Sequence, residues 1–366
     1  FKLPQVWKTA LAVDYQAPTS FPLTFTVEGM YNKDINAITQ ENWNVVNEGN
    51  LTRFVGPDNR YNYKSVSTPS VVSSVTGGAV VLSNTKKGYS GSFNFMVNAQ
   101  PIKDLYLMAS YIRMYAKEVS GLPGSQAYSS WQNLYSVDSP NLSGLQYSQY
   151  LTPHKVIASA NYKFEYGKGR NFCTSIGMFY TGYYEGTYTY YYGNDMNGDG
   201  QSIDLIYVPK TKDEIAFVDK NGFTAAQQAD AFWNFINQDD YLKGRKGKYT
   251  EAYGAKLPWL NRIDLKVAQD FKIKVGGQMN TLQFSVDILN AANLLNNSWG
   301  VTHTTAPANY GKILYSEGAV NNTPRYSMAT LTNPDKSKYL INKSFDTYKS
   351  SSNCWMLQFG IRYTFN

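Results

Sequence analysis

Large apolar side chains alternate with polar ones along much of this chain. The clearest stretch is the last one, where an apolar residue stands at every second position. These residues are Trp355, Leu357, Phe359, Ile361, Tyr363 and Phe365. Because successive side chains of a strand point to opposite faces, this pattern predicts a strand with one apolar and one mostly polar face.

The same alternation recurs along the chain and predicts nine strands. Their expected ranges are 5–15, 21–31, 88–99, 104–115, 154–166, 171–192, 259–275, 280–291 and 353–366. Most exceed the five or six residues that are common in soluble sheets. They are long enough for a tilted strand to cross a bilayer, which takes about 9–11 residues.

The expected connections alternate between short and long. Short turns are expected at 16–20, 100–103, 167–170 and 276–279, and long polar loops at 32–87, 116–153, 193–258 and 292–352. This is typical of an outer-membrane β-barrel with periplasmic turns and extracellular loops. The alternative is a tyrosine-rich β-sandwich of an adhesin or carbohydrate-binding module, which predicts shorter strands and inward apolar faces.

Composition narrows the class further. Mean hydropathy is −0.41, yet 15% of the residues are aromatic, including 31 tyrosines, which excludes a disordered chain. No apolar run is long enough for a membrane helix. The net charge of +7 comes without a dense basic cluster, so we expect no nucleic-acid partner. Cys173 and Cys354 could form one bridge or remain lone thiols.

Seven tyrosines lie in the C-terminal part of the sixth predicted strand. An amphipathic ring suits the headgroup level of a membrane, so these residues are predicted to form an interfacial girdle. They are Tyr180, Tyr183, Tyr184, Tyr188, Tyr190, Tyr191 and Tyr192.

The odd strand count carries its own prediction. Bacterial single-chain barrels have even strand numbers, whereas nine strands that end in the periplasm must begin on the extracellular side. Either a strand is missed or the chain is the C-terminal part of a larger barrel. Residues 79–84 are the best candidate for a missed element, as a continuation of the third strand. In a larger barrel the first strand must pair with something outside this sequence, because a sheet edge cannot face lipid.

Several stretches resemble a known family. These are Leu257-Pro-Trp-Leu-Asn-Arg-Ile-Asp-Leu-Lys-Val-Ala-Gln-Asp-Phe271, Thr281-Leu-Gln-Phe-Ser-Val-Asp-Ile-Leu-Asn290, Ala292-Asn-Leu-Leu-Asn296 and the terminal Gly360-Ile-Arg-Tyr-Thr-Phe365. They resemble the last strands of TonB-dependent outer-membrane receptors of the Bacteroidetes, closest to the Oar-like and more distantly to the SusC-like subgroup. The final stretch resembles a barrel-assembly signal, although Asn366 follows the aromatic residue.

The resemblance implies an all-β, transmembrane, antiparallel up-and-down barrel of about twenty-two strands. Residues 1–366 would be the C-terminal part of that one domain, without its plug and TonB box. It also implies uptake of a scarce ligand bound at the extracellular loops and driven by TonB–ExbB–ExbD. The implied partners are the rest of the barrel and plug, lipid or lipopolysaccharide, and a surface lipoprotein.

The sharpest local motif is Asp195-Met-Asn197-Gly-Asp199-Gly200. Oxygen ligands at alternate positions and glycine at the sixth match the first half of a calcium loop. Ile206 occupies the twelfth position, so this is not an EF-hand, and Asp204 is the candidate that closes the Ca²⁺ site. The alternative is a surface turn rich in Asx hydrogen bonds.

No pattern predicts an enzyme. His154 and His303 lie outside any metal or nucleophile motif. The alternating charges Arg262, Asp264, Lys266, Asp270 and Lys272 are expected to pair across strands or with a plug. The first hypothesis is therefore an active transporter of the outer membrane. The alternatives are a structural or adhesive surface protein and a passive β-barrel pore.

Overall fold

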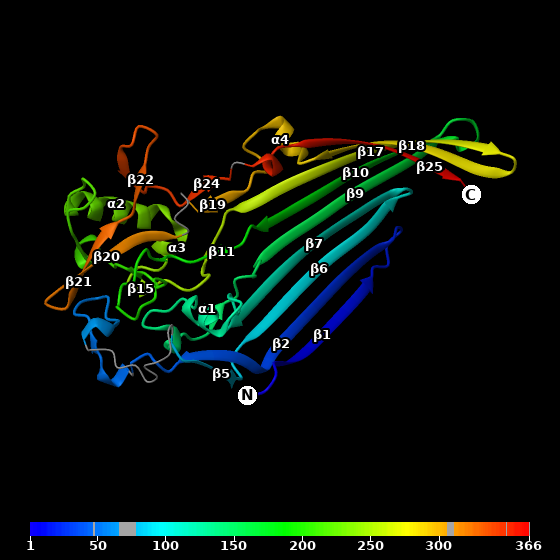
Figure 1. Cartoon of the computed structure of the whole chain (residues 1–366). Helices are drawn as coiled ribbons and strands as arrows, with labels where there is room; N and C mark the ends of the chain where they lie inside the picture. Colours follow the sequence, from blue (N-terminus) through cyan, green and yellow to red (C-terminus); the bar gives the residue numbers. More distant parts are fainter. Residues whose placement is uncertain (47, 66–77, 306–310, 349, 366) are drawn as a thin grey trace.

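The computed structural model describes residues 1–46, 48–65, 78–305, 311–348 and 350–365. Nine long strands form one antiparallel sheet in which the order of the strands follows the chain (Figure 1). Their bounds are β1 (Gln5–Gln16), β2 (Leu23–Asn42), β6 (Tyr89–Ile102), β7 (Leu105–Glu118), β9 (His154–Tyr166), β10 (Phe172–Tyr184), β17 (Trp259–Val275), β18 (Gln278–Leu289) and β25 (Met356–Phe365). The chain is mostly β, and the predicted antiparallel, up-and-down order of the nine long strands is confirmed.

The strand register gathers the apolar positions on one face of the sheet. One row across five strands runs Ala160, Met178, Leu265, Ile288 and Leu357. Met178 and Leu357 of this row are exposed, and Phe359 and Ile361, in the next rows of β25, are each 73% exposed. An apolar surface of this extent exceeds what water-soluble monomers usually expose. A sandwich would need a second sheet on this face, and the described residues contain none.

The two ends of the sheet differ in their connections. At one end the strands are joined by tight hairpins, and Gly276 and Gly277 supply the positive φ angles that the turn between β17 and β18 requires. At the other end the chain leaves the sheet for long excursions. The N-terminus lies at the end with the long excursions and the C-terminus at the hairpin end (Figure 1). This placement agrees with the expected start of the first strand on the long-loop side.

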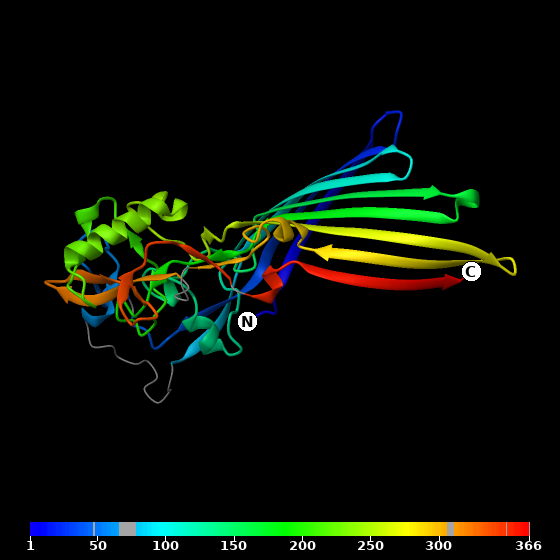
Figure 2. The ribbon, with the colours of Figure 1, turned by 90° about the horizontal axis from the view of Figure 1, so that it is seen from above.

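The sheet is curved but not closed (Figure 2). Among the described residues, β1 pairs only with β2, and β25 pairs only with β18. The predicted continuation of the third strand is present as β5 (Val80–Thr85). It pairs with β2 from Ala37 to Asn42, directly beyond the part of β2 that pairs with β6. The second strand is therefore longer than expected, and the first long loop begins near residue 43 rather than 32.

The predicted strand over 171–192 is wrong at its end. β10 stops at Tyr184, and the chain stays extended but changes partners. β11 (Thr187–Tyr188) pairs with β16 (Ala255–Lys256), and β12 (Tyr191–Tyr192) pairs with β20 (Lys312–Val320). The alternation of tyrosines continues past the end of the strand because these segments are also extended. It therefore could not mark where the long sheet ends.

The long connections do not form open polar loops, which is a second correction. They fold into a body that we call the cap, made of the described residues within 43–65, 119–153, 185–258 and 291–355 (Figures 1 and 2). Its remaining elements are β3 (Thr52–Arg53), β4 (Tyr61–Asn62), α1 (Ala127–Gln132), β8 (Gln146–Tyr147), β13 (Tyr207–Val208), β14 (Ala216–Phe217), α2 (Ala225–Gln238), α3 (Asp240–Lys243), β15 (Lys248–Tyr249), α4 (Ala291–Leu295), β19 (His303–Thr305), β21 (Thr323–Met328), β22 (Thr330–Thr332), β23 (Lys338–Leu340) and β24 (Phe345–Thr347).

The cap has a hydrophobic core of its own. A four-stranded sheet in the order β12, β20, β21 and β14 contacts α2. Phe232, Phe235 and Ile236 of α2 are buried with Tyr190 and Leu314. Burial of such side chains stabilises the folded cap by about 1.5–3 kcal/mol each. The cap is therefore a folded body with its own core at one end of the sheet.

The helices and the cysteines bear on two further expectations. None of the helices in the described chain combines the length and apolar character needed to cross a membrane. Cys173 is buried and Cys354 is exposed, and both are free thiols. The alternative of a single bridge is therefore excluded.

Candidate functional site

The face of the sheet opposite the apolar one is polar and internally paired. Lys266 Nζ lies 2.8 Å from Asp287 Oδ1 on the neighbouring strand. Lys272 Nζ lies 2.5 Å from Glu165 Oε1, and this ion pair joins β17 to β9. Arg262 Nε is 3.5 Å from Asp264 Oδ1. The predicted pairing across strands is therefore present for Lys266 and Lys272, whereas Arg262 and Asp264 approach each other within β17 and Asp270 accepts a hydrogen bond from Gln283.

The centre of the cap holds a buried ion pair that draws distant segments together. Asp58 and Arg60 are almost fully buried, and Arg60 Nε donates to Asp58 Oδ1 over 2.8 Å. The same carboxylate accepts hydrogen bonds from the hydroxyls of Tyr192, Tyr249 and Tyr326 at 3.0–3.1 Å. Three tyrosines from separate parts of the cap therefore converge on one aspartate.

The guanidinium of Arg60 also reaches backbone oxygens. It donates to Leu205 O at 2.6 Å and to Val137 O at 3.1 Å. Burial alone would lower the pKa of Arg60, but Asp58, Tyr192 and Asp204 hold it well above its ordinary value. Arg60 is therefore a fixed cation that links the segments around residues 58, 137 and 205.

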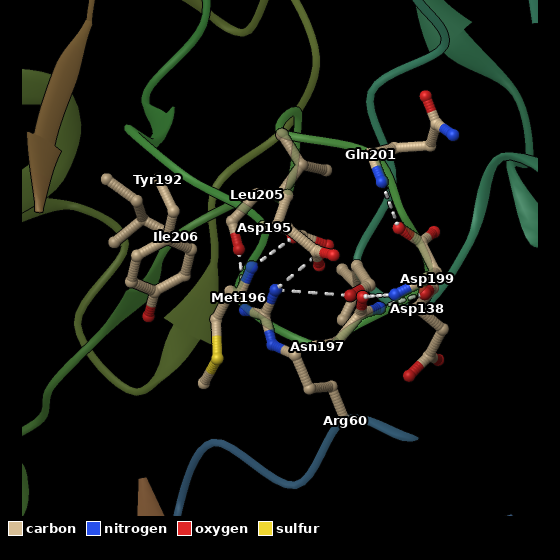
Figure 3. Close-up of polar contacts among 12 residues, drawn as sticks. Arg60, Asp138, Tyr192, Asp195, Met196, Asn197, Asp199, Gln201, Leu205 and Ile206 are labelled. Atoms are coloured by element: carbon tan, nitrogen blue, oxygen red, sulfur yellow. Dashed lines mark hydrogen bonds and ion pairs between the residues drawn. The ribbon is translucent and has the colours of Figure 1, made fainter. Parts of the chain in front are cut away.

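The predicted calcium loop lies beside Arg60 (Figure 3). Asp195 accepts the backbone N–H groups of Gly198 at 2.6 Å and Gly200 at 3.0 Å. Asn197 Oδ1 accepts the N–H of Asp199, and Asp199 Oδ1 accepts that of Gln201. Each of these contacts is an Asx hydrogen bond of the kind that the alternative interpretation requires.

Asp204, the expected closing ligand, faces Arg60 instead of open space. Its Oδ1 lies 3.7 Å from Arg60 Nη1, and its Oδ2 accepts the N–H of Met196 at 2.8 Å. Burial raises the pKa of Asp204 to about 8, although Arg60 opposes the shift. Burial, Asp204 and Asp195 together raise the pKa of Asp199 well above its usual range.

The structure thus brings the four residues Asp195, Asn197, Asp199 and Asp204 into one loop without arranging them around a cation. No group of three or more His, Cys, Asp or Glu side chains in the described chain could hold a metal ion. Asp199 Oδ2 is buried and has no hydrogen-bond partner among the residues that the structure describes. Calcium binding therefore stays a prediction, and the raised pKa values of Asp204 and Asp199 oppose it, because Ca²⁺ binds ionised carboxylates.

A cavity of about 710 Å³ lies where the cap meets the sheet. Aromatic side chains line much of it, namely Tyr147, Tyr184, Tyr188, Tyr241 and Phe345. Asp239 at its wall is already engaged, because it accepts hydrogen bonds from Tyr190, Ser344 and the N–H of Leu242. Such a mixture of rings and polar groups is typical of a binding site for a small molecule.

The expected tyrosine girdle is only partly present. Tyr190, Tyr191 and Tyr192 are buried in the cap rather than placed on the apolar face, so this part of the prediction is wrong. The hydroxyls of Tyr190 and Tyr192 donate to Asp239 and Asp58 inside the cap, and the ring of Tyr191 packs against that of Tyr135. Tyr180 and Tyr184 do lie on the apolar side of the sheet, opposite Ile263 and Trp259 in register.

Sequence reasoning missed Asp58, Arg60 and helix α2. One signal could have found the helix: Thr224 and Gln227 have the spacing of a capping box, and they form it. Asp58 and Arg60 carry no such signal, because their partners lie in distant segments. Comparison of the chain with protein-family models, with curated proteins and with solved structures finds no match in any of the three.

Proposed function

We propose that the sheet is part of the wall of an outer-membrane β-barrel, with the cap outside the cell and the hairpin turns in the periplasm. The observation that carries this proposal is the continuous apolar face of nine long strands, exposed on the opposite side from a polar and ion-paired face. Lipid outside and water inside a barrel demand this division. In water the same exposed surface would promote aggregation.

The free edges of the sheet fit a larger barrel. Unpaired backbone groups of β1 and β25 would each cost several kcal/mol in lipid, so further strands must pair with them. We propose that these strands and a plug complete a TonB-dependent transporter, as the resemblance to Bacteroidetes receptors implies. The folded cap and its cavity of about 710 Å³ support capture of a ligand before uptake.

Membrane insertion can be tested by spin labels on adjacent residues of β6. We place single labels at Val97→Cys and Asn98→Cys in the full-length protein after replacing Cys173 and Cys354 by serine. Val97 belongs to the apolar face and Asn98 to the polar face. In a bilayer the Val97 label should respond to oxygen and the Asn98 label to an aqueous nickel chelate. Equal exposure of both labels to the nickel chelate would contradict the proposal.

Conductance separates active uptake from a passive pore. The full-length protein in a planar bilayer should give no steady current in potassium chloride, because a plug fills the barrel. Stepwise, lasting conductance would favour the passive pore. Uptake of a fluorescent oligosaccharide, oligopeptide or ferric chelate that stops on adding a protonophore would favour the transporter over a purely adhesive protein.

A further inference from the structure

A row of basic and aromatic side chains crosses the apolar side of the sheet at its cap end. Arg113 of β7 lies opposite His154 of β9, and Tyr184 of β10 lies opposite Trp259 of β17. The rings of His154 and Tyr184 are 5.8 Å apart, and those of Tyr184 and Trp259 are 5.1 Å apart. The four residues therefore form one continuous row over four strands.

Two lysines add positive charge to this row. Lys256 Nζ lies 5.0 Å from the ring of Tyr184, and Lys117 Nζ lies 4.5 Å from the ring of Tyr147. Within the described residues, Arg113, Lys117 and Lys256 form no ion pair with a carboxylate. Burial lowers the pKa of Lys256, and the nearby positive charge of Arg113 lowers it further. This contrasts with Lys266 and Lys272 on the polar face, which are paired.

The carboxylates of the adjoining cavity do not neutralise the row. Glu251 is 3.1 Å from Arg245, and Asp239 already accepts three hydrogen bonds. Asp240 is the remaining carboxylate that lines this cavity, and Lys256 and Tyr184 line it too. The row therefore carries more positive than negative charge, which favours binding of an anionic ligand.

The surface next to the row indicates what kind of anion. Tyr111 lies two positions from Arg113 on the same face and its hydroxyl is 2.7 Å from His154 Nδ1. Toward the hairpin end, the adjoining row holds Val156, Gly182 and Asn261, whose Oδ1 accepts the indole N–H of Trp259 at 3.0 Å. The row after it is apolar and holds Ala158, Tyr180 and Ile263. A molecule with both an acyl chain and an anionic head would contact both surfaces at once. Arginine and lysine are strong ligands for phosphate.

We propose that this row binds the phosphate of an anionic membrane lipid whose acyl chains lie along the apolar face. The inference rests on the proposed function, because it requires that this face contacts lipid. Arg113 and Lys256 hold the phosphate, and Tyr184 and Trp259 hold the boundary between headgroup and acyl chains. Aromatic residues are common at this level of membrane proteins.

Native mass spectrometry of the delipidated full-length protein tests the proposal. The probes are phosphatidylglycerol, phosphatidylcholine with the same acyl chains, and inorganic phosphate. We expect the parent protein to prefer phosphatidylglycerol. Arg113→Gln combined with Lys256→Gln should weaken phosphatidylglycerol binding roughly tenfold to thirtyfold, since each basic side chain near an anionic lipid contributes about 1 kcal/mol.

Lys155→Gln is the matched control. Lys155 follows His154 in β9 but points to the polar face, over the ring of Tyr183. It should bind phosphatidylglycerol like the parent protein. Lys256→Gln alone should retain the fold, because the Lys256 side chain makes no hydrogen bond in the described chain, and should weaken binding about fivefold.

Three results would overturn the inference. The double variant and Lys256→Gln could bind phosphatidylglycerol as tightly as the parent protein, or Lys155→Gln could weaken binding as much as they do. Inorganic phosphate could also match the affinity of the lipid, which would make a soluble anion the ligand. If the label at Val97 still reports lipid contact in these cases, the membrane proposal stands while the lipid site fails.

Discussion

Asp58 and Arg60 show how one buried ion pair can organise a body made of separate loops. Removing one partner of a buried pair leaves an uncompensated charge and typically costs about 3–5 kcal/mol. Asp58 also holds three tyrosine hydroxyls, and Arg60 holds two backbone oxygens. The cap should therefore depend on this pair far more than on its exposed ion pairs.

We expect Arg60→Met to destabilise the cap by about 3–5 kcal/mol, because Asp58 remains buried without its cation. Thermal unfolding in detergent, followed by near-ultraviolet circular dichroism of the tyrosines, measures the change. Arg53→Met is the control, since Arg53 is half-exposed and 3.9 Å from Asp138, and it should cost less than about 1 kcal/mol. Equal effects of the two substitutions would contradict the central role of Arg60.

Asp204 gives the cap a dependence on pH. Its pKa of about 8 means that the folded cap holds a proton that the unfolded chain releases near pH 4. Stability should therefore fall as the pH rises from about 4 to about 8, by up to about 1.4 kcal/mol per pH unit, and change little through this group above that range. Asp199, whose pKa is also raised, acts in the same direction.

Asp204→Asn should flatten this dependence, because asparagine can still accept the N–H of Met196 but cannot titrate. Unfolding temperatures of the cap in the presence of a chelator, taken from pH 5 to pH 8, give the slope. Asp213→Asn, at an exposed site on the cap, should keep the slope of the parent protein. An unchanged slope in Asp204→Asn would show that another group carries the effect.

At the scale of elements, a strand, helix or contact can be predicted from the sequence when the residues that form it are close together in the chain. The long strands follow from local alternation, because every side chain of β25 or β18 meets either the apolar or the polar face. Helix α2 also has a local signal, because Thr224 and Gln227 form its capping box. The contacts of Tyr190 and Tyr192 depend on Asp239 and Asp58, 49 and 134 residues away, so no local pattern could reveal them.

The two faces of β18 make a direct prediction about its environment. Phe284→Lys puts a charge in the middle of the apolar face, and in a bilayer it should lower the free energy of unfolding by about 2–4 kcal/mol. Gln283→Lys is the control on the polar face, where Gln283 lies 2.7 Å from Asp270 and a lysine can pair with it. Urea titration after reconstitution into vesicles measures both. A larger loss for Gln283→Lys would reverse the assignment of faces.

At the scale of the whole molecule, the structure is polarised along the strands. The cap lies at one end of a curved sheet and the hairpin turns at the other, with the two chain ends at opposite ends of the sheet (Figures 1 and 2). A body with its own core at only one end gives the protein two chemically different sides. If the sheet crosses a membrane, one side must present the cap and the other only short turns.

Epitope tags test this polarity in intact cells. One tag is inserted between Asn221 and Gly222, an exposed turn of the cap, and the other between Gly276 and Gly277 in a hairpin turn. Both sites have positive φ angles in tight turns that point away from the core, so the inserts should leave the fold intact. An antibody added to whole cells should reach the first tag and not the second, whereas both should react once the outer membrane is opened. Labelling of the hairpin tag alone would invert the orientation, and labelling of neither tag before opening would place the cap inside the cell envelope.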